Sequence, residues 1–221
     1  MQSTNTLQEF YAAPRGAYGN ALLNWSQHAP SDVIAYAVSY RNAAHNLVAY
    51  REYLGIGSID QAACPIIFLF RHAIELYLKG MIYRLARLSI CDAEVQTVLP
   101  RLWREHSLVK LLNMAQPTIS GMRHKLPPAL RDFAEQDLAF MKALDQIDSG
   151  SYTFRYPVAS NGKSSLPNLL LTNIFVVAEH ADHALDFLND LCLHLIEQVH
   201  ILEPQVRLDL VVFSEMLQRD A

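Results

Sequence analysis

The chain has 221 residues, of which 51% are hydrophobic, and this is long enough for one sizeable core. Its 8 glycines are too few for an all-β fold with many tight turns. The formal net charge of −4 gives no electrostatic basis for non-specific nucleic-acid binding, so a nucleic-acid site would have to be a local basic groove.

The N-terminal part of the chain is predicted to be helical. Short helices are expected at residues 4–12 and 17–28, each followed by a proline. Ser31 is a suitable N-cap for a long helix that runs to about Leu54, and Gly55 ends it.

Residues 64–88 form the helix around which the rest of the chain is expected to be arranged. Its apolar residues recur at steps of three and four, and its other faces are scarcely more polar, so the helix is predicted to be buried. It begins near Ser58 or Asp60, and Pro65 is tolerated in its first turns. Four ionisable residues interrupt the apolar pattern: Arg71, His72, Glu75 and Lys79.

Shorter helices are predicted in the middle of the chain. A helical turn is expected at 92–99, a helix at 107–115 that stops before Pro117, and an amphipathic helix at 127–148. The irregular segment at 149–167 follows, in which alternating aromatic residues allow a short extended piece.

The chain closes with a long helix at 168–200 and, after Pro204, a final amphipathic helix at 206–217. The expected fold is therefore an all-α bundle of four to five main helices, with short irregular helices and one long loop at 149–167. We divide it into an N-terminal helical extension packed on the core, the core bundle and a C-terminal helix, at residues 1–57, 58–202 and 203–221.

No metal, cofactor or membrane span is predicted. The three cysteines lack metal-ligand spacing and indicate free thiols in a reducing compartment. The last long helix carries one Glu-x-x-His pair, Glu197 and His200, whereas a di-iron bundle uses two such pairs. No signal peptide is recognisable at the N-terminus and no window of about eighteen residues is free of charge, so we expect a cytoplasmic protein.

The charged residues of the 64–88 helix allow two interpretations. Arg71, Glu75 and Lys79 are spaced four apart and share one side of the helix. They either form a structural network that holds the 149–167 loop through Arg155, or line a groove in which Arg71 and Lys79 hold phosphate. In the groove, His72 or Glu75 would move a proton.

Three further positions carry candidate functional residues. His106 precedes a capped helix, where it either satisfies backbone groups or lines the same groove. Arg155, flanked by Phe154 and Tyr156, can bury its stem and still reach a carboxylate, for which Glu75 is the expected partner. Arg41 and His45, four residues apart, share a helix face as packing or functional residues.

The string RHAIELYLKG at residues 71–80 resembles the core helix of HEPN-like proteins, which are small prokaryotic helical domains. The strings HSL at 106–108 and FRYP at 154–157 follow in the family's order, so the resemblance covers about residues 60–200. It implies a helical bundle, usually a homodimer, associated with toxin–antitoxin, abortive-infection or other defence systems. Many members cut RNA without a metal, and others bind nucleotides, RNA or partner proteins.

The RNA-cutting members carry an arginine followed, after four to six residues, by a histidine. Arg101 and His106 have this spacing, although Leu102 rather than a polar residue follows the arginine. Arg41 has the polar follower, but His45 comes one residue too soon. These two pairs are the candidate catalytic residues.

The leading hypothesis is a dimer that binds RNA or a nucleotide. The candidate binding residues are Arg71, His72, Glu75, Lys79, Arg155 and Tyr156. The rival hypotheses are a metal-independent endoribonuclease and a non-catalytic subunit that binds a cognate partner protein.

Overall fold

The computed structural model describes residues 29–54, 59–89, 99–166 and 171–219. Its α-helices are α2 (Ala29–Leu54), α3 (Ile59–Ser89), α5 (Leu108–Met122), α6 (Glu135–Ile147) and α7 (Ile174–Arg219). Two short 3-10 helices, η2 (Arg123–Lys125) and η3 (Pro128–Leu130), connect α5 to α6, and residues 99–104 are also helical. The described residues contain no β-strand, which confirms the predicted all-α bundle.

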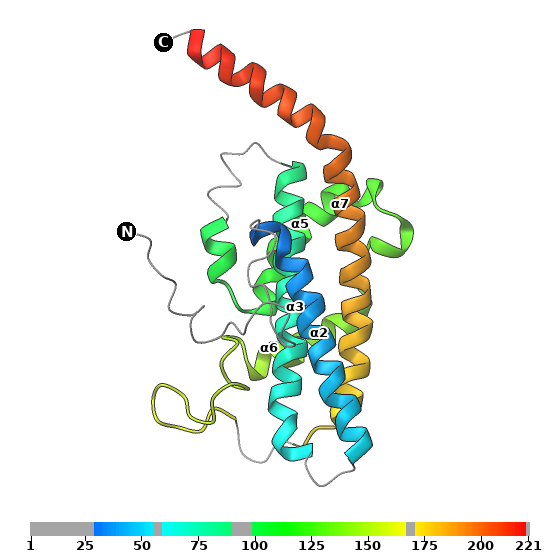
Figure 1. The fold of residues 1–221 in the computed structure, drawn as a ribbon, viewed down its shortest axis with the longest axis vertical. Helices are drawn as coiled ribbons and strands as arrows, with labels where there is room; N and C mark the ends of the chain where they lie inside the picture. The colour runs from blue at the N-terminus through cyan, green and yellow to red at the C-terminus, as the bar shows by residue number, and fades with distance from the viewer. Residues whose placement is uncertain (1–28, 55–58, 90–98, 167–170, 220–221) are drawn as a thin grey trace, which may run out of the picture.

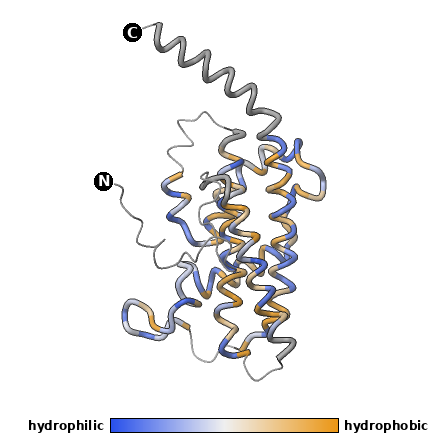
Figure 2. Tube along the Cα trace, in the orientation of Figure 1, coloured by the Kyte–Doolittle hydropathy of each residue, from blue (hydrophilic) through white to orange (hydrophobic). Residues whose placement is uncertain are grey.

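Helix α3 lies at the centre of the bundle. It packs along α2 on one side and along α7 on another, and these three helices run side by side in Figure 1. It also contacts α5, which packs on α6 in turn. Figure 2 shows hydrophobic residues recurring along the helices, interleaved with hydrophilic ones.

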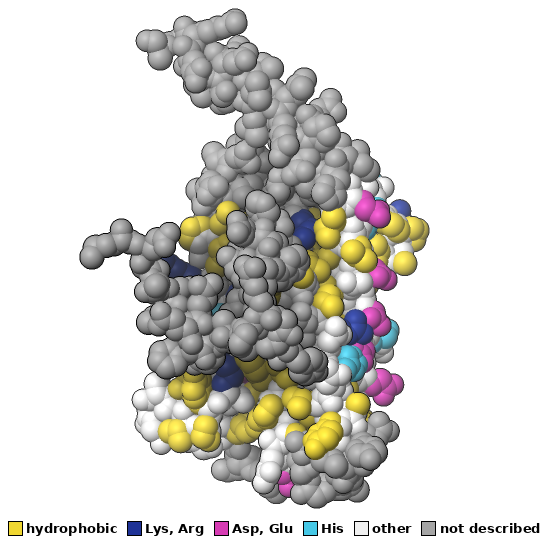
Figure 3. Space-filling view, viewed as in Figure 1, with side chains coloured by type: hydrophobic (Ala, Val, Ile, Leu, Met, Phe, Trp, Pro, Cys, Tyr) yellow, Lys and Arg dark blue, Asp and Glu magenta, His cyan; other side chains and the backbone are white. Residues whose placement is uncertain are grey.

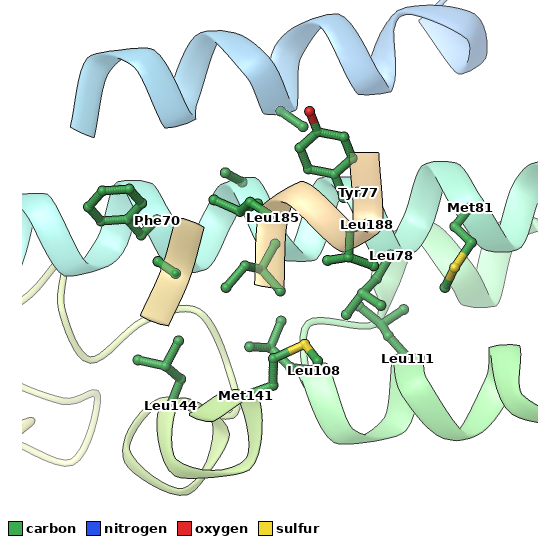
Figure 4. Packing of buried hydrophobic residues seen from close by; sticks show 14 of the residues in the cluster. Phe70, Tyr77, Leu78, Met81, Leu108, Leu111, Met141, Leu144, Leu185 and Leu188 are labelled. Carbon is green, nitrogen blue, oxygen red and sulfur yellow. The ribbon is translucent and has the colours of Figure 1, made fainter. Parts of the chain in front are cut away.

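The core forms around α3 because this helix buries residues on several faces. Phe70, Tyr77, Leu78 and Met81 are each at most 1% exposed. Figure 4 shows these side chains beside those of the helices that cover α3: Leu108 and Leu111 of α5, Met141 and Leu144 of α6, and Leu185 and Leu188 of α7. The prediction that the 64–88 helix is buried is therefore confirmed.

Helices α2 and α3 approach closely where their facing residues are small. Ala37 and Ala44 of α2 are fully buried. On α3, a Cβ atom added at Gly80 would lie only 2.5 Å from Cδ1 of Ile34. Glycine at this position therefore lets the two helices lie against each other.

Two predicted helix ends at prolines are wrong. Helix α5 continues through Pro117 to Met122, and α7 continues through Pro204 to Arg219. A proline removes one backbone hydrogen bond and can bend a helix without ending it. Helix α7 therefore crosses the predicted boundary between the core bundle and the C-terminal helix without a break.

The predicted helix at 127–148 is shorter than expected. Only α6 is α-helical there, and residues 131–134 separate it from the short helix η3. In this separating segment Phe133 packs against Phe187 of α7, with ring centroids 4.5 Å apart. The chain bends at Arg131 and Asp132 instead of continuing as a helix.

The segment after α6 is irregular as predicted, but its aromatic residues form a turn instead of an extended piece. The backbone N–H groups of Arg155 and Tyr156 both donate to the carbonyl of Tyr152. Among the described residues, β-pairing is limited to one isolated bridge between Val158 and Ser164.

The helices predicted at 4–12 and 17–28, and residues 92–98 of the turn predicted at 92–99, lie outside the described residues. Within the described ranges, no helix is both long and apolar enough to cross a membrane.

Candidate functional site

The carboxylate of Glu75 is the centre of a buried charge network. Its Oε2 atom accepts from Nη1 of Arg71 at 3.0 Å, and its Oε1 atom accepts from Nζ of Lys79 at 2.8 Å. Nδ1 of His106 lies 2.9 Å from the same Oε1 atom. Arg71, Glu75 and Lys79 are each at most 4% exposed. The predicted pairing along one side of the helix is therefore present.

Arg71 and Lys79 also bind backbone carbonyls from other parts of the chain. Arg71 donates through Nε to the carbonyl of Asp148 at 2.9 Å and through Nη2 to that of His106 at 2.8 Å. Lys79 donates to the carbonyl of Trp103 at 3.3 Å. The network thus fastens residues 103–106 and the end of α6 to α3.

The surrounding charges keep Glu75 ionised although it is buried. Burial raises the pKa of its carboxyl group, but the charge of Lys79 and its hydrogen bond, the neighbouring imidazole of His106 and the charge of Arg71 outweigh this effect. The net result is a pKa below the ordinary value of 4.5. At neutral pH the network therefore contains a buried carboxylate between buried cations.

The predicted pair between Arg155 and Glu75 is wrong. The guanidinium of Arg155 is exposed and lies over the rings of Phe68 and Tyr156, with Cζ 5.5 Å and 5.6 Å from the two centroids. His106 takes the place that had been assigned to Arg155. The 149–167 loop is held to the network through the carbonyl of Asp148 instead.

The phosphate-binding roles of Arg71 and Lys79 stay predictions without geometric support. Arg71 is 0% exposed and bonds to Glu75 and to two carbonyls. An incoming phosphate could bind Arg71 only by displacing these acceptors. The buried network therefore acts in the structure as a fastening between segments.

His106 is the member of the network that reaches the surface. Its side chain is 46% exposed while Nδ1 stays on Glu75, and no described residue hydrogen-bonds to Nε2. Oε1 of Glu105 accepts the backbone N–H groups of His106 and Ser107. This arrangement fixes the imidazole and leaves one ring nitrogen for a ligand or a proton.

The first turn of α5 holds His106 in position. Oγ of Ser107 caps the helix by accepting from the N–H of Lys110 at 3.2 Å. Asp145 of α6 accepts from this hydroxyl at 2.8 Å and from the N–H of Leu108 at 2.7 Å. The helix end is thus bound to α6 by a buried carboxylate.

Arg101 lies on the helical residues just before His106. Together with Pro100, Arg104 and Glu105 it lines a hollow, and both arginines are exposed. No hydrogen bond joins Arg101 to His106 among the described residues. The Arg101–His106 pair therefore supplies an exposed cation and an oriented imidazole on one short segment.

The second candidate pair, Arg41 and His45, is bound to acidic residues of α7. Nη2 of Arg41 lies 2.8 Å and Nε2 of His45 lies 2.7 Å from Oδ1 of Asp182, and Nη1 of Arg41 lies 2.7 Å from Asp186. Burial lowers the pKa of Arg41, but the hydrogen bonds and charges of the two aspartates raise it above its usual value. Figure 3 shows acidic, basic and histidine side chains gathered along the α7 edge of that face.

The carboxylates around Arg41 reduce the value of this pair as a phosphate site. Asp182 and Asp186 together carry more negative charge than Arg41 neutralises, and a phosphate would be repelled. Arg41 and His45 lie together as predicted, but their contacts with Asp182 and Asp186 connect α2 to α7.

Two of the predicted binding residues, His72 and Arg155, contact Phe68 on another surface, and Tyr156 contacts Arg155 there. The ring of His72 stacks on Phe68 at 5.5 Å between centroids, and Arg155 covers Phe68 beside Tyr156. Burial lowers the pKa of His72 below 6.5, so this imidazole is neutral at pH 7. Arg71, Glu75 and Lys79 belong to the buried network instead.

Several contacts of these arrangements were not predicted. Asp145, Asp148 and Asp182 supply carboxylates to partners far along the chain, and no local pattern marks these partners. Phe68 could have been found, because it lies four residues before His72 and so shares its helix face. No group of three or more residues suited to holding a metal ion exists among the described residues.

No protein-family model, curated protein or solved structure matches this chain.

Proposed function

We propose that this protein is an RNA-binding helical domain of the HEPN-like kind that acts as a dimer in a prokaryotic defence or stress response. The observation that supports the proposal most is His106, whose exposed ring is oriented by the buried carboxylate of Glu75. A fixed imidazole beside exposed arginines is suited to a phosphodiester, because its protonated form can donate through Nε2 to a phosphate oxygen within a positive surface.

The charges around His106 favour an anionic ligand although the whole chain is acidic. Arg101, Arg104 and Lys110 are exposed on the same segment, and Glu105 is the acidic side chain among them. Glu105 is occupied by the N–H groups of His106 and Ser107 and by Lys110, whose Nζ lies 3.4 Å away. The segment therefore presents a local excess of positive charge, which is what a chain of net charge −4 needs for RNA.

Binding of a labelled RNA at increasing salt concentration tests the proposal. The variant Arg101→Ala/Arg104→Ala should bind more weakly, and its plot of log affinity against log salt should be flatter by about 0.7 for each lost phosphate contact with single-stranded RNA. The control Lys125→Ala/Lys142→Ala removes the same charge from exposed positions elsewhere. Absence of binding by the wild type at low salt, or equal weakening in both variants, would refute the proposal.

The contact between Glu75 and His106 also favours a second candidate, a metal-independent endoribonuclease. A carboxylate that holds one imidazole nitrogen sets the ring orientation and lets the other nitrogen exchange a proton. His106, in its neutral form, would take the proton from a ribose 2′-hydroxyl as the 2′-oxygen bonds to the adjacent phosphorus. The bond from phosphorus to the 5′-oxygen then breaks, the leaving 5′-oxygen takes a proton from the imidazolium or from water, and Arg101 would stabilise the negative charge that develops on the phosphate.

Cleavage of RNA in the presence of EDTA tests the second candidate. Activity should disappear in His106→Ala and on a substrate whose 2′-hydroxyl is replaced by hydrogen. His124→Ala serves as a control, because this histidine is also exposed but lies at the other end of α5. Binding without cleavage would leave the domain as a binding protein.

A further inference from the structure

Aromatic rings and one guanidinium form a continuous row across α2, α3 and the loop that follows α6. The ring of Tyr40 meets His72 edge-on at 4.5 Å, and His72 stacks on Phe68 at 5.5 Å. The guanidinium carbon of Arg155 then lies 5.5 Å from the Phe68 centroid and 5.6 Å from that of Tyr156. The row ends at Tyr152, whose ring centroid is 4.6 Å from that of Tyr156.

The loop holds the outer part of this row in a fixed position. Phe154 is buried in the core at 6% exposure, and Oδ1 of Asp148 accepts the N–H groups of Tyr152 at 2.6 Å and Thr153 at 2.9 Å. With the middle residue anchored inside, Tyr152 and Tyr156 remain at the surface, 37% and 48% exposed. The turn that Asp148 and Phe154 hold in place therefore exposes both tyrosine rings to solvent.

The guanidinium of Arg155 has N–H groups that are available to a ligand. Within the described part of the chain no carboxylate pairs with it, in contrast to Arg41, Arg71 and Arg123, which all have acidic partners. Its contacts are the faces of Phe68 and Tyr156, so the N–H groups at the edge of the guanidinium plane are left for a ligand. Such a group can donate to a phosphate or to a base edge while it stays stacked.

We propose that Tyr152, Arg155 and Tyr156 form a stacking site for the unpaired bases of single-stranded RNA. The proposal rests on the RNA-binding function proposed above and names the form of RNA that is bound. Exposed aromatic faces next to a cation are the features by which proteins bind single strands, because every base has a face that can stack. In a duplex the bases are stacked on one another, so they cannot stack on protein side chains.

The test compares a labelled single-stranded oligoadenylate with a blunt RNA duplex in an anisotropy titration. Tyr156→Ala should weaken binding of the single strand by about fivefold to a hundredfold, the effect of losing one stacked base. Tyr156→Phe should bind like the wild type, because stacking uses the ring and not the hydroxyl. Phe175→Ala is the matched control, since Phe175 is an exposed aromatic residue on α7, 39% exposed.

A second variant, Arg155→Ala, removes the guanidinium of the row. It should weaken single-strand binding and flatten its salt dependence, whereas Tyr156→Ala should leave the salt dependence unchanged. Unchanged melting temperatures of both variants would show that the loss comes from the site and not from the fold. Duplex binding should stay at the wild-type level in both.

The outcomes separate this inference from the proposed function. If the wild type binds neither RNA, the proposed function fails and the stacking site fails with it. If Arg101→Ala/Arg104→Ala loses single-strand affinity while Tyr156→Ala keeps it, the RNA-binding function stands and the stacking site is overturned. Equal weakening in Phe175→Ala and Tyr156→Ala would also overturn the stacking site.

Discussion

Replacing Glu75 by glutamine tests whether the buried network stabilises the fold. The substitution keeps the size of the side chain but leaves Arg71 and Lys79, 0% and 4% exposed, without their shared counter-charge. Breaking a buried ion pair by removing one partner lowers the free energy of unfolding by about 3–5 kcal/mol. For a protein of this size that corresponds to a fall in melting temperature of roughly 6–20 °C.

Urea unfolding followed by circular dichroism measures this loss. Glu105→Gln is the control, because Glu105 is partly exposed and its amide replacement still accepts the same N–H groups. The double variant Glu75→Gln/Lys79→Met should lose less than the sum of the two single variants, since it removes one of the unpaired cations together with the carboxylate. A loss below about 1 kcal/mol in Glu75→Gln would contradict the reasoning, because it lies within the range of exposed pairs.

Three further predictions concern stability. The pKa of Glu75 is lower in the folded protein than its ordinary value of 4.5. The stabilisation by its carboxylate is therefore complete above pH 4.5 and is lost as the pH falls towards the folded pKa. Urea titrations from about pH 6 to about pH 3 should show a steeper fall in the free energy of unfolding for the wild type than for Glu75→Gln. Ser107→Ala should lower the free energy of unfolding by about 1–2 kcal/mol, because the α5 cap is lost and buried Asp145 loses a donor; Ser120→Ala, exposed on the same helix, should be nearly neutral. Gly80→Leu should destabilise by about 1–3 kcal/mol because its Cβ would meet Ile34 at 2.5 Å, and Ile34→Ala in the same chain should recover part of that loss in thermal melts.

The bundle could be predicted from the sequence because its main signals are local. The apolar pattern of residues 64–88 identified a buried helix, and the spacing of Arg71, Glu75 and Lys79 identified pairs within one helix. Pro117 and Pro204 were misread because a proline disturbs one turn without ending the helix. Around Pro117, buried apolar residues on both sides, Leu111 and Ile119, keep the helix packed.

The partners of the network could not be predicted because they are distant in sequence. The carbonyl of Asp148 lies 77 residues from Arg71, and His106 lies 31 residues from Glu75. The expected contact between Arg155 and Glu75 failed for a related reason. The sequence shows how far an arginine side chain can reach but not the direction in which it points. Because Phe154 is buried in the core, its neighbour Arg155 points away from the network.

The charge balance of the network is suited to fastening segments of the chain and not to binding phosphate. Arg71 and Lys79 face two buried carboxylates, Glu75 and Asp148, the latter with Oδ2 3.6 Å from Nε of Arg71. Two positive charges thus meet two negative ones, and a further anion finds no excess of positive charge there. The same guanidinium of Arg71 holds the carbonyls of His106 and Asp148, which carry the two proposed RNA surfaces on either side of it. A substitution at Arg71, Glu75 or Lys79 that weakens RNA binding can therefore act by displacing His106 or the loop, whereas substitutions at the exposed residues Arg101, Arg104, Arg155 and Tyr156 test contact with RNA directly.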